Sequence, residues 1–297
     1  MKRLLIIGCG DVGLRVALLL QSRYRIYALT HSTERLTVLR ARGLIPLAGD
    51  LDQADTLAGL PGLAHEVIHL APPPNSGRID TRTAHLIAAL TRGGSLPQHF
   101  IYISTSGVYG DCGGEWIDET RPLRPQTDRA RRRADAEQRL RDWGARTGVR
   151  VSILRVPGIY AADRLPVARI RRGTPALLPR DDAWVNHVHA DDLARMVVAA
   201  LRRGQANRSY NASDDAPQKM GDYFDMIADR FHLPRPPRMA RDDAQIAIPA
   251  NLYSFMNESR QLTNRRIKQE LRVRLQYPTV REGIAAAAGL PEFSYGR

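Results

Sequence analysis

The sequence predicts an α/β protein with a doubly wound parallel sheet and a smaller C-terminal domain. Short apolar segments alternate with longer amphipathic segments through the first half of the chain, and a glycine-rich turn follows the first apolar segment. Strands separated by helices of about 10–15 residues are typical of βαβ units. Because the expected strands are almost wholly apolar, we expect helices to cover both faces of the sheet.

Hydrophobic periodicity places the elements in chain order. The expected strands are Leu4–Ile7, Tyr24–Leu29, Leu44–Leu47, Val67–Leu70, Phe100–Ile103 and Val151–Leu154. The expected helices are Val12–Leu20, Thr33–Arg40, Asp80–Leu90, Asp128–Trp143 and Leu193–Leu201.

The pattern changes after Pro157, where prolines and short irregular stretches become frequent. We therefore expect one domain over residues 1–160, to which residues 184–203 return, and a smaller substrate-binding domain over residues 161–297.

The chain is strongly basic, with 44 Lys and Arg against 31 Asp and Glu and a net charge of +13 over 297 residues. Such a charge suits nucleic acid, anionic membranes or phosphorylated small molecules. Aromatic residues make up only 6% of the chain, and no known nucleic-acid-binding motif is present, so no dedicated nucleic-acid partner is expected. The charge favours a small, anionic ligand.

Cysteine usage and hydropathy indicate the compartment. Cys9 and Cys112 are the only cysteines, which excludes a disulfide framework. No apolar run approaches the ~18 residues of a membrane span. We expect a cytoplasmic protein without membrane attachment. No metal site is expected, because the histidines and cysteines do not show metal-ligand spacing.

The glycine turn carries the main functional motif. Gly8, Gly10 and Gly13, with Asp11 and Val12 between the last two, form a GxGxxG element that follows an expected strand and opens the helix expected over Val12–Leu20. In this context the motif predicts a dinucleotide site: the first glycine permits the turn, the second admits the pyrophosphate and the third allows close helix packing. The alternative is an ordinary strand–helix turn.

The end of the second expected strand indicates which dinucleotide binds. NAD sites place an acidic residue about 20 positions after the glycine turn. Here Thr30, His31 and Ser32 occupy that place, with Arg35 close behind. Hydroxyls, an imidazole and a guanidinium suit a 2′-phosphate, which favours NADP over NAD. Alternatively, Glu34 turns inward, or NAD binds without an acid.

Several motifs together resemble the extended short-chain dehydrogenase/reductases, in particular the NAD-dependent epimerase/dehydratase group. The matching segments are Gly8–Gly13, Gly49–Leu51, His69–Ala71, Ile103–Gly110, Leu154–Tyr160, His189–Leu193 and Tyr210–Ser213. The resemblance implies cofactor contacts from Asp50, Leu51, Leu70, Ala71 and Pro72, although Pro72 begins a triple proline where the family has small residues.

In that family a Ser or Thr positions the substrate, and the Tyr of a Tyr-x-x-x-Lys motif is the acid/base. Thr105 matches the first position, but Arg129 and Arg133 stand where the Tyr and Lys are expected, followed by the matching Glu137. None of the three lysines has a tyrosine four residues before it. This departure is similar to an atypical bacterial branch, the YeeZ-type proteins.

An arginine stays protonated, so Arg129 cannot serve as the acid/base. Arg129 either binds an anionic substrate or lies on a solvated helix. Arg133 either provides a fixed cation near the ribose or pairs with Glu137 on the helix surface. Tyr109 is the first substitute donor, and Tyr160 is the second; pocket lining is the alternative role for both.

Two functions follow from these observations. The first is an NAD(P)-binding oxidoreductase or epimerase-like enzyme that exchanges hydride with a small anionic or nucleotide-sugar-like substrate, with Thr105, Tyr109, Arg129 and Arg133 as the catalytic candidates. The second is a non-catalytic protein that senses NADP(H). The sequence leaves open whether the protein forms a homodimer.

Overall fold

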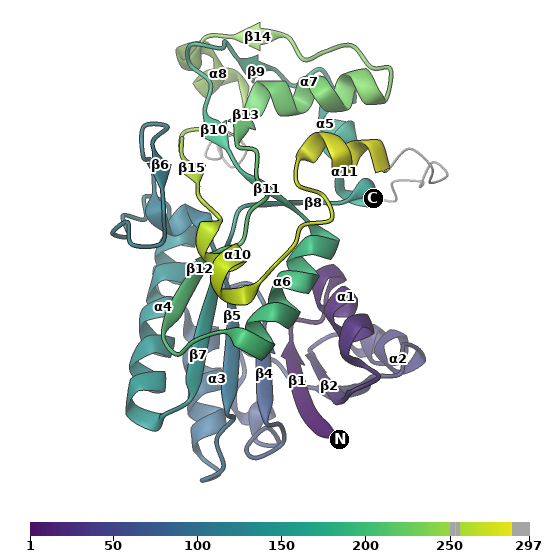
Figure 1. Ribbon diagram of the computed structural model, residues 1–297, viewed down its shortest axis with the longest axis vertical. Helices are drawn as coiled ribbons and strands as arrows, with labels where there is room; N and C mark the ends of the chain where they lie inside the picture. Colours follow the sequence, from purple (N-terminus) through teal and green to yellow (C-terminus); the bar gives the residue numbers. More distant parts are fainter. Residues whose placement is uncertain (250–252, 254–255, 287–297) are drawn as a thin grey trace.

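The structure, a computed structural model, describes residues 1–249, 253 and 256–286. A seven-stranded sheet forms its centre (Figure 1). In spatial order its strands are β12 (Arg208–Asn211), β7 (Arg150–Val156), β5 (His99–Thr105), β4 (Glu66–His69), β1 (Lys2–Ile7), β2 (Tyr24–Thr30) and β3 (Ile45–Ala48). All neighbouring strands run parallel, which confirms the predicted doubly wound Rossmann-type sheet.

Helices cover both faces of the sheet, which explains why its strands are so apolar. Along β1, Leu4 and Ile6 belong to the core beneath one helical layer, whereas Leu5 and Ile7 belong to the core beneath the other. All four side chains are almost fully buried. The first layer contains α1 (Asp11–Leu20), α2 (Thr33–Ala41), α6 (Ala190–Arg203) and α10 (Arg265–Leu271). The second contains α3 (Thr81–Thr91) and α4 (Asp128–Thr147).

The strand order reverses at β1. The chain first builds outward through β2 and β3 and then crosses to β4 on the other side of β1. At such a switch point the connections leave in opposite directions, which opens a crevice at the carboxyl ends of the strands.

Shorter elements lie above those carboxyl ends (Figure 1). The strands there are β8 (Gly158–Tyr160), β9 (Ala176–Leu177), β10 (Trp184–Val185), β11 (His187–His189), β13 (Gln218–Lys219) and β14 (Arg238–Met239). The helices are α5 (Val167–Arg171), α7 (Met220–Arg230), α8 (Arg241–Ala247) and α11 (Val280–Ala286). Beside them, β6 (Trp116–Ile117) pairs with β15 (Gln261–Leu262).

The return of residues 184–203 to the first domain stays a prediction, as does the domain assignment of the later segments. The helix α6 packs on α1, and two later elements, β12 and α10, also lie with the sheet. The division at residue 160 stays a prediction.

The helix α4 has a buried face despite its many charges. Thr127 caps its start by accepting a hydrogen bond from Ala130 N at 3.2 Å. Leu140 and Trp143 are buried, and so are Arg132 and Glu137. The interpretation of this segment as a wholly solvated helix is therefore wrong, because the sheet covers one of its sides.

Among the helices in the described ranges, none combines the length and apolarity that crossing a membrane requires.

Candidate active site

The turn between β1 and α1 is shaped by its glycines. Gly8 has a φ of +80°, and a Cβ there would lie 2.5 Å from the backbone nitrogen of Ala71. A Cβ on Gly13 would lie 3.3 Å from the carbonyl oxygen of Gly8, whereas a Cβ on Gly10 would meet no atom within 4 Å. The turn thus has an open face at Gly10, at the amino end of α1, where backbone N–H groups favour an anion.

A cavity of about 310 Å³, here called the turn cavity, opens at this turn. Its lining residues are Gly8, Gly10, Asp11, Val12, Gly13, Leu70, Ile103, Ser104, Thr105, Arg133, Val156, Pro157, Ile159, Arg164 and Leu193. The five predicted residues of the glycine turn and Leu70 therefore lie together, at the crevice that the strand order predicts.

The first helical residue, Asp11, is held by two arginines. Its Oδ1 accepts a hydrogen bond from Arg15 Nε at 2.9 Å, and its Oδ2 lies 3.3 Å from Arg164 NH1. Arg164 comes from the irregular segment after β8, where no motif distinguishes it in the sequence. It brings an unpredicted positive charge to the turn cavity.

The end of β2 lies beside the same turn. The hydroxyls of Thr30 and Ser32 accept hydrogen bonds from Ser32 N at 3.2 Å and Arg35 N at 3.4 Å, so they shape the turn and cap α2. The Arg35 guanidinium donates to the carbonyl oxygen of Cys9 at 2.6 Å. His31 is exposed. Of this predicted set, Arg35 touches the glycine turn directly.

The remaining predicted cofactor residues are spread around the crevice. Asp50 accepts a hydrogen bond from Asp52 N at 2.9 Å in the turn after β3, and Leu51 is buried in the core beneath α3. Ala71 lies against the first glycine of the turn. Pro72 lines a second, adjoining cavity.

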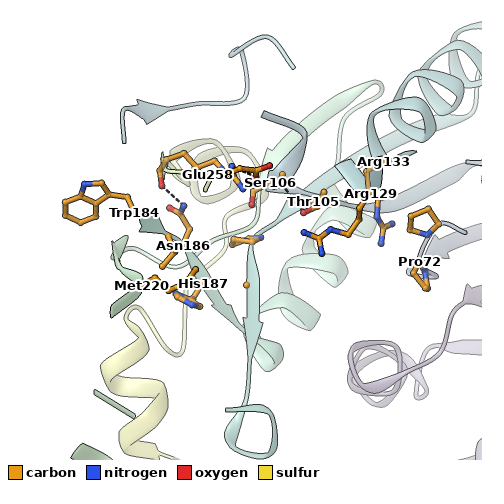
Figure 2. Close-up of a pocket in the computed structure, with 16 residues that line it drawn as sticks. Pro72, Thr105, Ser106, Arg129, Arg133, Trp184, Asn186, His187, Met220 and Glu258 are labelled. Carbon is orange, nitrogen blue, oxygen red and sulfur yellow. Dashed lines mark hydrogen bonds and ion pairs between the residues drawn. The ribbon is translucent and has the colours of Figure 1, made fainter. Parts of the chain in front are cut away.

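This second cavity, here called the arginine cavity, has a volume of about 370 Å³ (Figure 2). Its lining residues are Pro72, Pro73, Thr105, Ser106, Gly107, Arg129, Arg133, Pro157, Gly158, Trp184, Val185, Asn186, His187, Met220, Glu258 and Arg260. Thr105, Arg133 and Pro157 line both cavities, so the two adjoin. The structure thus brings Thr105, Arg129 and Arg133 together beside the glycine turn.

Arg133 is held at the end of the sheet. Its NH1 donates to the carbonyl oxygen of Ile103 at 2.7 Å and to the hydroxyl of Tyr102 at 3.1 Å. Thr105, two residues after Ile103, accepts a hydrogen bond from Gly107 N at 3.2 Å. Backbone contacts on β5 therefore fix both the cation and the hydroxyl where the two cavities meet.

The arginine cavity carries excess positive charge. Among the described residues that line it, Glu258 is the one acidic residue, and it pairs with Arg260 at 2.8 Å. Partial burial lowers the pKa of Arg129; Glu258 opposes this shift, whereas the charges of Arg132, Arg133 and Arg260 add to it. An arginine nevertheless remains protonated, so the cavity favours an anionic group. Sequence analysis missed Arg260 and Glu258, which follow the fifth strand by some 150 residues and carry no motif.

The predicted alternative of an Arg133–Glu137 surface pair is wrong. Glu137 is 1% exposed and binds Arg155, with 2.8 Å between Arg155 NH2 and Glu137 Oε2. The hydroxyl of Ser104 donates to its other oxygen at 2.6 Å. Glu137 therefore anchors α4 to β5 and β7 beneath the cavity.

The structure does not bring Tyr109 into either cavity. Its hydroxyl donates to Asn211 Oδ1 at 2.7 Å and accepts from Arg155 at 3.0 Å. Burial raises its pKa to about 12. Tyr160 is likewise buried, and its hydroxyl donates to the carbonyl oxygen of Thr279 at 3.3 Å. Both predicted substitute donors thus have partners within the protein.

Asp214 lies 2% exposed in the connection after β12, and its backbone N–H donates to the carbonyl oxygen of His187 at 2.8 Å. Burial raises the pKa of this carboxyl from 3.8 to about 8, and Asp215 and Asp192 contribute to the rise. Because the pKa is higher in the folded state, the folded protein binds this proton more tightly than the unfolded chain. Asp214 therefore opposes folding increasingly as the pH rises from about 4 to about 8.

Asp214→Asn is expected to match the wild type in thermal stability at pH 4 and to exceed it at pH 8, because asparagine resembles the protonated carboxyl. Thermal unfolding of both proteins at the two pH values measures the difference. An equal offset at both values would show that Asp214 does not titrate in this range.

In the described part of the chain, no group of three or more His, Cys, Asp or Glu side chains could hold a metal ion.

A sequence model of the NAD-dependent epimerase/dehydratase family matches residues 5–213, which include the glycine turn, β5 and α4. The chain belongs to this family. The match begins within β1 and ends just after β12, so it covers the seven-stranded sheet apart from the first residues of β1 and omits the C-terminal segments that supply Glu258 and Arg260.

Individual relatives agree with this membership. An NAD(P)H azoreductase of Xenophilus azovorans is 28% identical over 68% of this chain, and the match spans 64% of that relative's length. A functionally unknown conserved protein of Silicibacter pomeroyi is 28% identical, with a TM-score of 0.78 and coverage of 97% of this chain and 98% of the other. A UDP-glucose 4-epimerase of Thermotoga maritima shares the fold at 17% identity, with a TM-score of 0.77 and coverage of 96% and 97%.

The geometry of this family member fits a nicotinamide dinucleotide. The open face at Gly10 and the amino end of α1 suit a pyrophosphate, and the Arg35 guanidinium brings positive charge to the glycine turn. The turn cavity leads directly into the arginine cavity, as a dinucleotide next to its substrate requires.

Proposed function

We propose that this protein is an NADP(H)-dependent oxidoreductase or epimerase-like enzyme that acts on a small anionic substrate. The observation that carries this function is the junction of the two cavities at Thr105, Arg133 and Pro157. The dinucleotide, when bound, donates or accepts the hydride. The charge of the arginine cavity supports an anionic substrate.

The residues of this chain have separate roles in the proposed reaction. Arg129 binds the anionic group of the substrate. Arg133 takes the place of the family's lysine as a fixed cation beside the ribose, a role that its hydrogen bonds to the end of β5 support. Thr105 orients a hydroxyl or carbonyl of the substrate.

A turnover assay tests this function. Oxidation of NADPH is followed with a panel of carbonyl compounds and nucleotide sugars, and the Arg129→Gln variant is compared with the wild type. We expect KM for an anionic substrate to rise about tenfold in the variant, since an arginine–anion contact contributes roughly 1.5–3 kcal/mol. If NADPH binds but no compound is turned over, the proposed enzymatic function is contradicted.

The preference for NADP is proposed on the position of Arg35. Arg35→Ala is expected to weaken NADPH binding about tenfold and to leave NADH binding within about twofold, because only NADPH carries the 2′-phosphate. Titration calorimetry measures both affinities. Arg40→Ala, an exposed change on the same helix, serves as the control. Equal affinities of the wild type for the two dinucleotides would contradict the preference.

A second candidate is a non-catalytic NADP(H) sensor, which the two arginines at the Tyr and Lys positions favour. It predicts tight NADPH binding, no turnover and a change of oligomeric state or partner with the redox state of the dinucleotide. Size-exclusion chromatography with NADP and with NADPH distinguishes the two functions. It also shows whether the protein forms a homodimer.

A further inference from the structure

His187 lines the arginine cavity on the side away from Arg129 and Arg133 (Figure 2). Its side chain is more than nine-tenths buried, at 7% exposed. Its Nδ1 is buried and has no hydrogen-bond partner among the described residues, whereas Nε2 is not among the buried atoms that lack one. Among the described residues the ring is thus held by packing rather than by hydrogen bonds to Nδ1, and Nε2 is the ring nitrogen available to a ligand in the cavity.

Gly158 leaves one edge of this imidazole open. The two residues face each other across the β8–β11 pair, and both line the arginine cavity. A Cβ on Gly158 would lie 3.0 Å from Cδ2 and 3.4 Å from Nε2 of His187. Because Gly158 has no Cβ, no side chain at residue 158 covers this edge of the ring.

The imidazole is surrounded by groups that are uncharged at neutral pH. Its ring packs on Tyr223, with 4.2 Å between centroids, and its edge meets Tyr160. Asp214, whose backbone contacts His187, keeps its proton because burial raises its pKa to about 8. Burial in turn lowers the pKa of His187 to about 4, so the ring stays neutral. A neutral imidazole recognises an uncharged hydroxyl or carbonyl rather than a second anion.

Other polar groups at this side of the cavity already have partners. The Asn186 amide donates to the carbonyl oxygen of Arg260 at 2.9 Å, and its oxygen accepts from Leu262 N at 2.8 Å. Met220 lies beside His187, and Asn186 stands between His187 and Trp184 (Figure 2). Nε2 of His187 is thus a candidate to recognise a polar atom here.

We propose that Nε2 of His187 hydrogen-bonds an uncharged oxygen of a ligand whose anionic group is bound by Arg129 and Arg133. The ligand class is a hydroxylated or oxo-substituted carboxylic acid or phosphate ester. This inference rests on the proposed function for the location of the substrate. It adds a second contact, between His187 and an uncharged oxygen, to the contact of the arginines with the anionic group.

Matched pairs of probes test the inference by calorimetry in saturating NADPH. Each pair differs in hydroxylation alone: malate and succinate, mandelate and phenylacetate, and glycerol 3-phosphate and n-propyl phosphate. The wild type is expected to bind the hydroxylated member of at least one pair ten times more tightly, about 1.4 kcal/mol. Carboxylate and phosphate pairs show which anion the arginines prefer.

The variants separate recognition from folding. His187→Phe keeps an aromatic ring against Tyr223 and is expected to reduce the tenfold ratio to about one, whereas His187→Gln keeps part of it. Gly158→Ala narrows the space beside Nε2 and is expected to lower the ratio. Arg129→Gln weakens both members of a pair equally and leaves the ratio unchanged. Unaltered NADPH affinity and melting temperature show that each variant is folded.

A spectroscopic measurement reports the contact directly. In ¹⁵N-histidine-labelled protein, the ring nitrogens of His187 are expected to shift with the hydroxylated probe and not with its partner. A tenfold ratio that survives in His187→Phe, an absence of discrimination in all pairs, or a failure of all probes to bind alongside NADPH would overturn the inference. Probe binding without turnover would contradict the proposed enzyme and leave the His187 contact supported.

Discussion

Replacing Gly10 with valine is expected to weaken dinucleotide binding at least about 100-fold while the fold stays intact. Gly10 has a negative φ, and a Cβ there would meet no atom within 4 Å, so the turn has room for a side chain at this position. The valine side chain would fill the space that a pyrophosphate needs to reach the backbone N–H groups. Loss of two charge-assisted hydrogen bonds of about 1.5–3 kcal/mol each accounts for this factor. Fluorescence titration with NADPH measures it, and thermal unfolding checks the fold.

Substitutions at two other glycines serve as comparisons for Gly10→Val. Gly8→Val is expected to prevent folding, because its φ is +80° and a Cβ would lie 2.5 Å from Ala71 N. Gly59→Val, on an exposed turn with open space around it, is expected to change neither binding nor stability. Normal NADPH affinity in Gly10→Val would mean that the dinucleotide does not approach this turn.

Glu137→Leu is expected to destabilise the protein by about 3–5 kcal/mol. Arg155 is 4% exposed, and the carboxylate of Glu137 is the anionic partner of its guanidinium. Removing that carboxylate leaves a buried positive charge uncompensated, which costs far more than the loss of an exposed pair. Thermal or urea unfolding measures the change.

The double variant Glu137→Leu/Arg155→Met identifies the cause. Because both charges are removed together, it is expected to regain most of the lost stability. Asp229→Ala, which breaks the exposed pair with Arg235, serves as the control and is expected to have little effect. A double variant as unstable as Glu137→Leu would show that shape, rather than charge, dominates at this position.

The succession of strands and helices along the chain as far as β7 was predictable, because each of these elements carries its own periodic pattern. The alternation of Leu4 to Ile7 between two helical layers explains why β1 is continuously apolar. The glycine turn was predictable for a related reason: Gly8 and Gly13 are constrained by contacts within the turn or with the neighbouring strand end, whereas Gly10 keeps one face of the turn open.

The partners of α4 were not predictable. Helical spacing places Arg129, Arg133 and Glu137 on one side of a helix, which made a surface pair of Arg133 and Glu137 an equally good interpretation. The structure instead pairs Glu137 with Arg155 of β7 and ties Arg133 to β5. Only the packing of α4 on the sheet decides which of these charges is buried.

The sequence by itself determined the fold, the glycine turn and the arginines that replace the family's Tyr and Lys, since these depend on local pattern and on residue identity. The tertiary structure alone decided that Arg260 and Glu258 complete the charged cavity, that Tyr109 lies outside it, and that His187 lines it while its Nδ1 bonds to none of the described residues. These features depend on contacts between segments 50 to 150 residues apart, for example the 102 residues between Tyr109 and Asn211. No local pattern encodes such contacts, because many distant partners satisfy the same side chain equally well until the chain is folded.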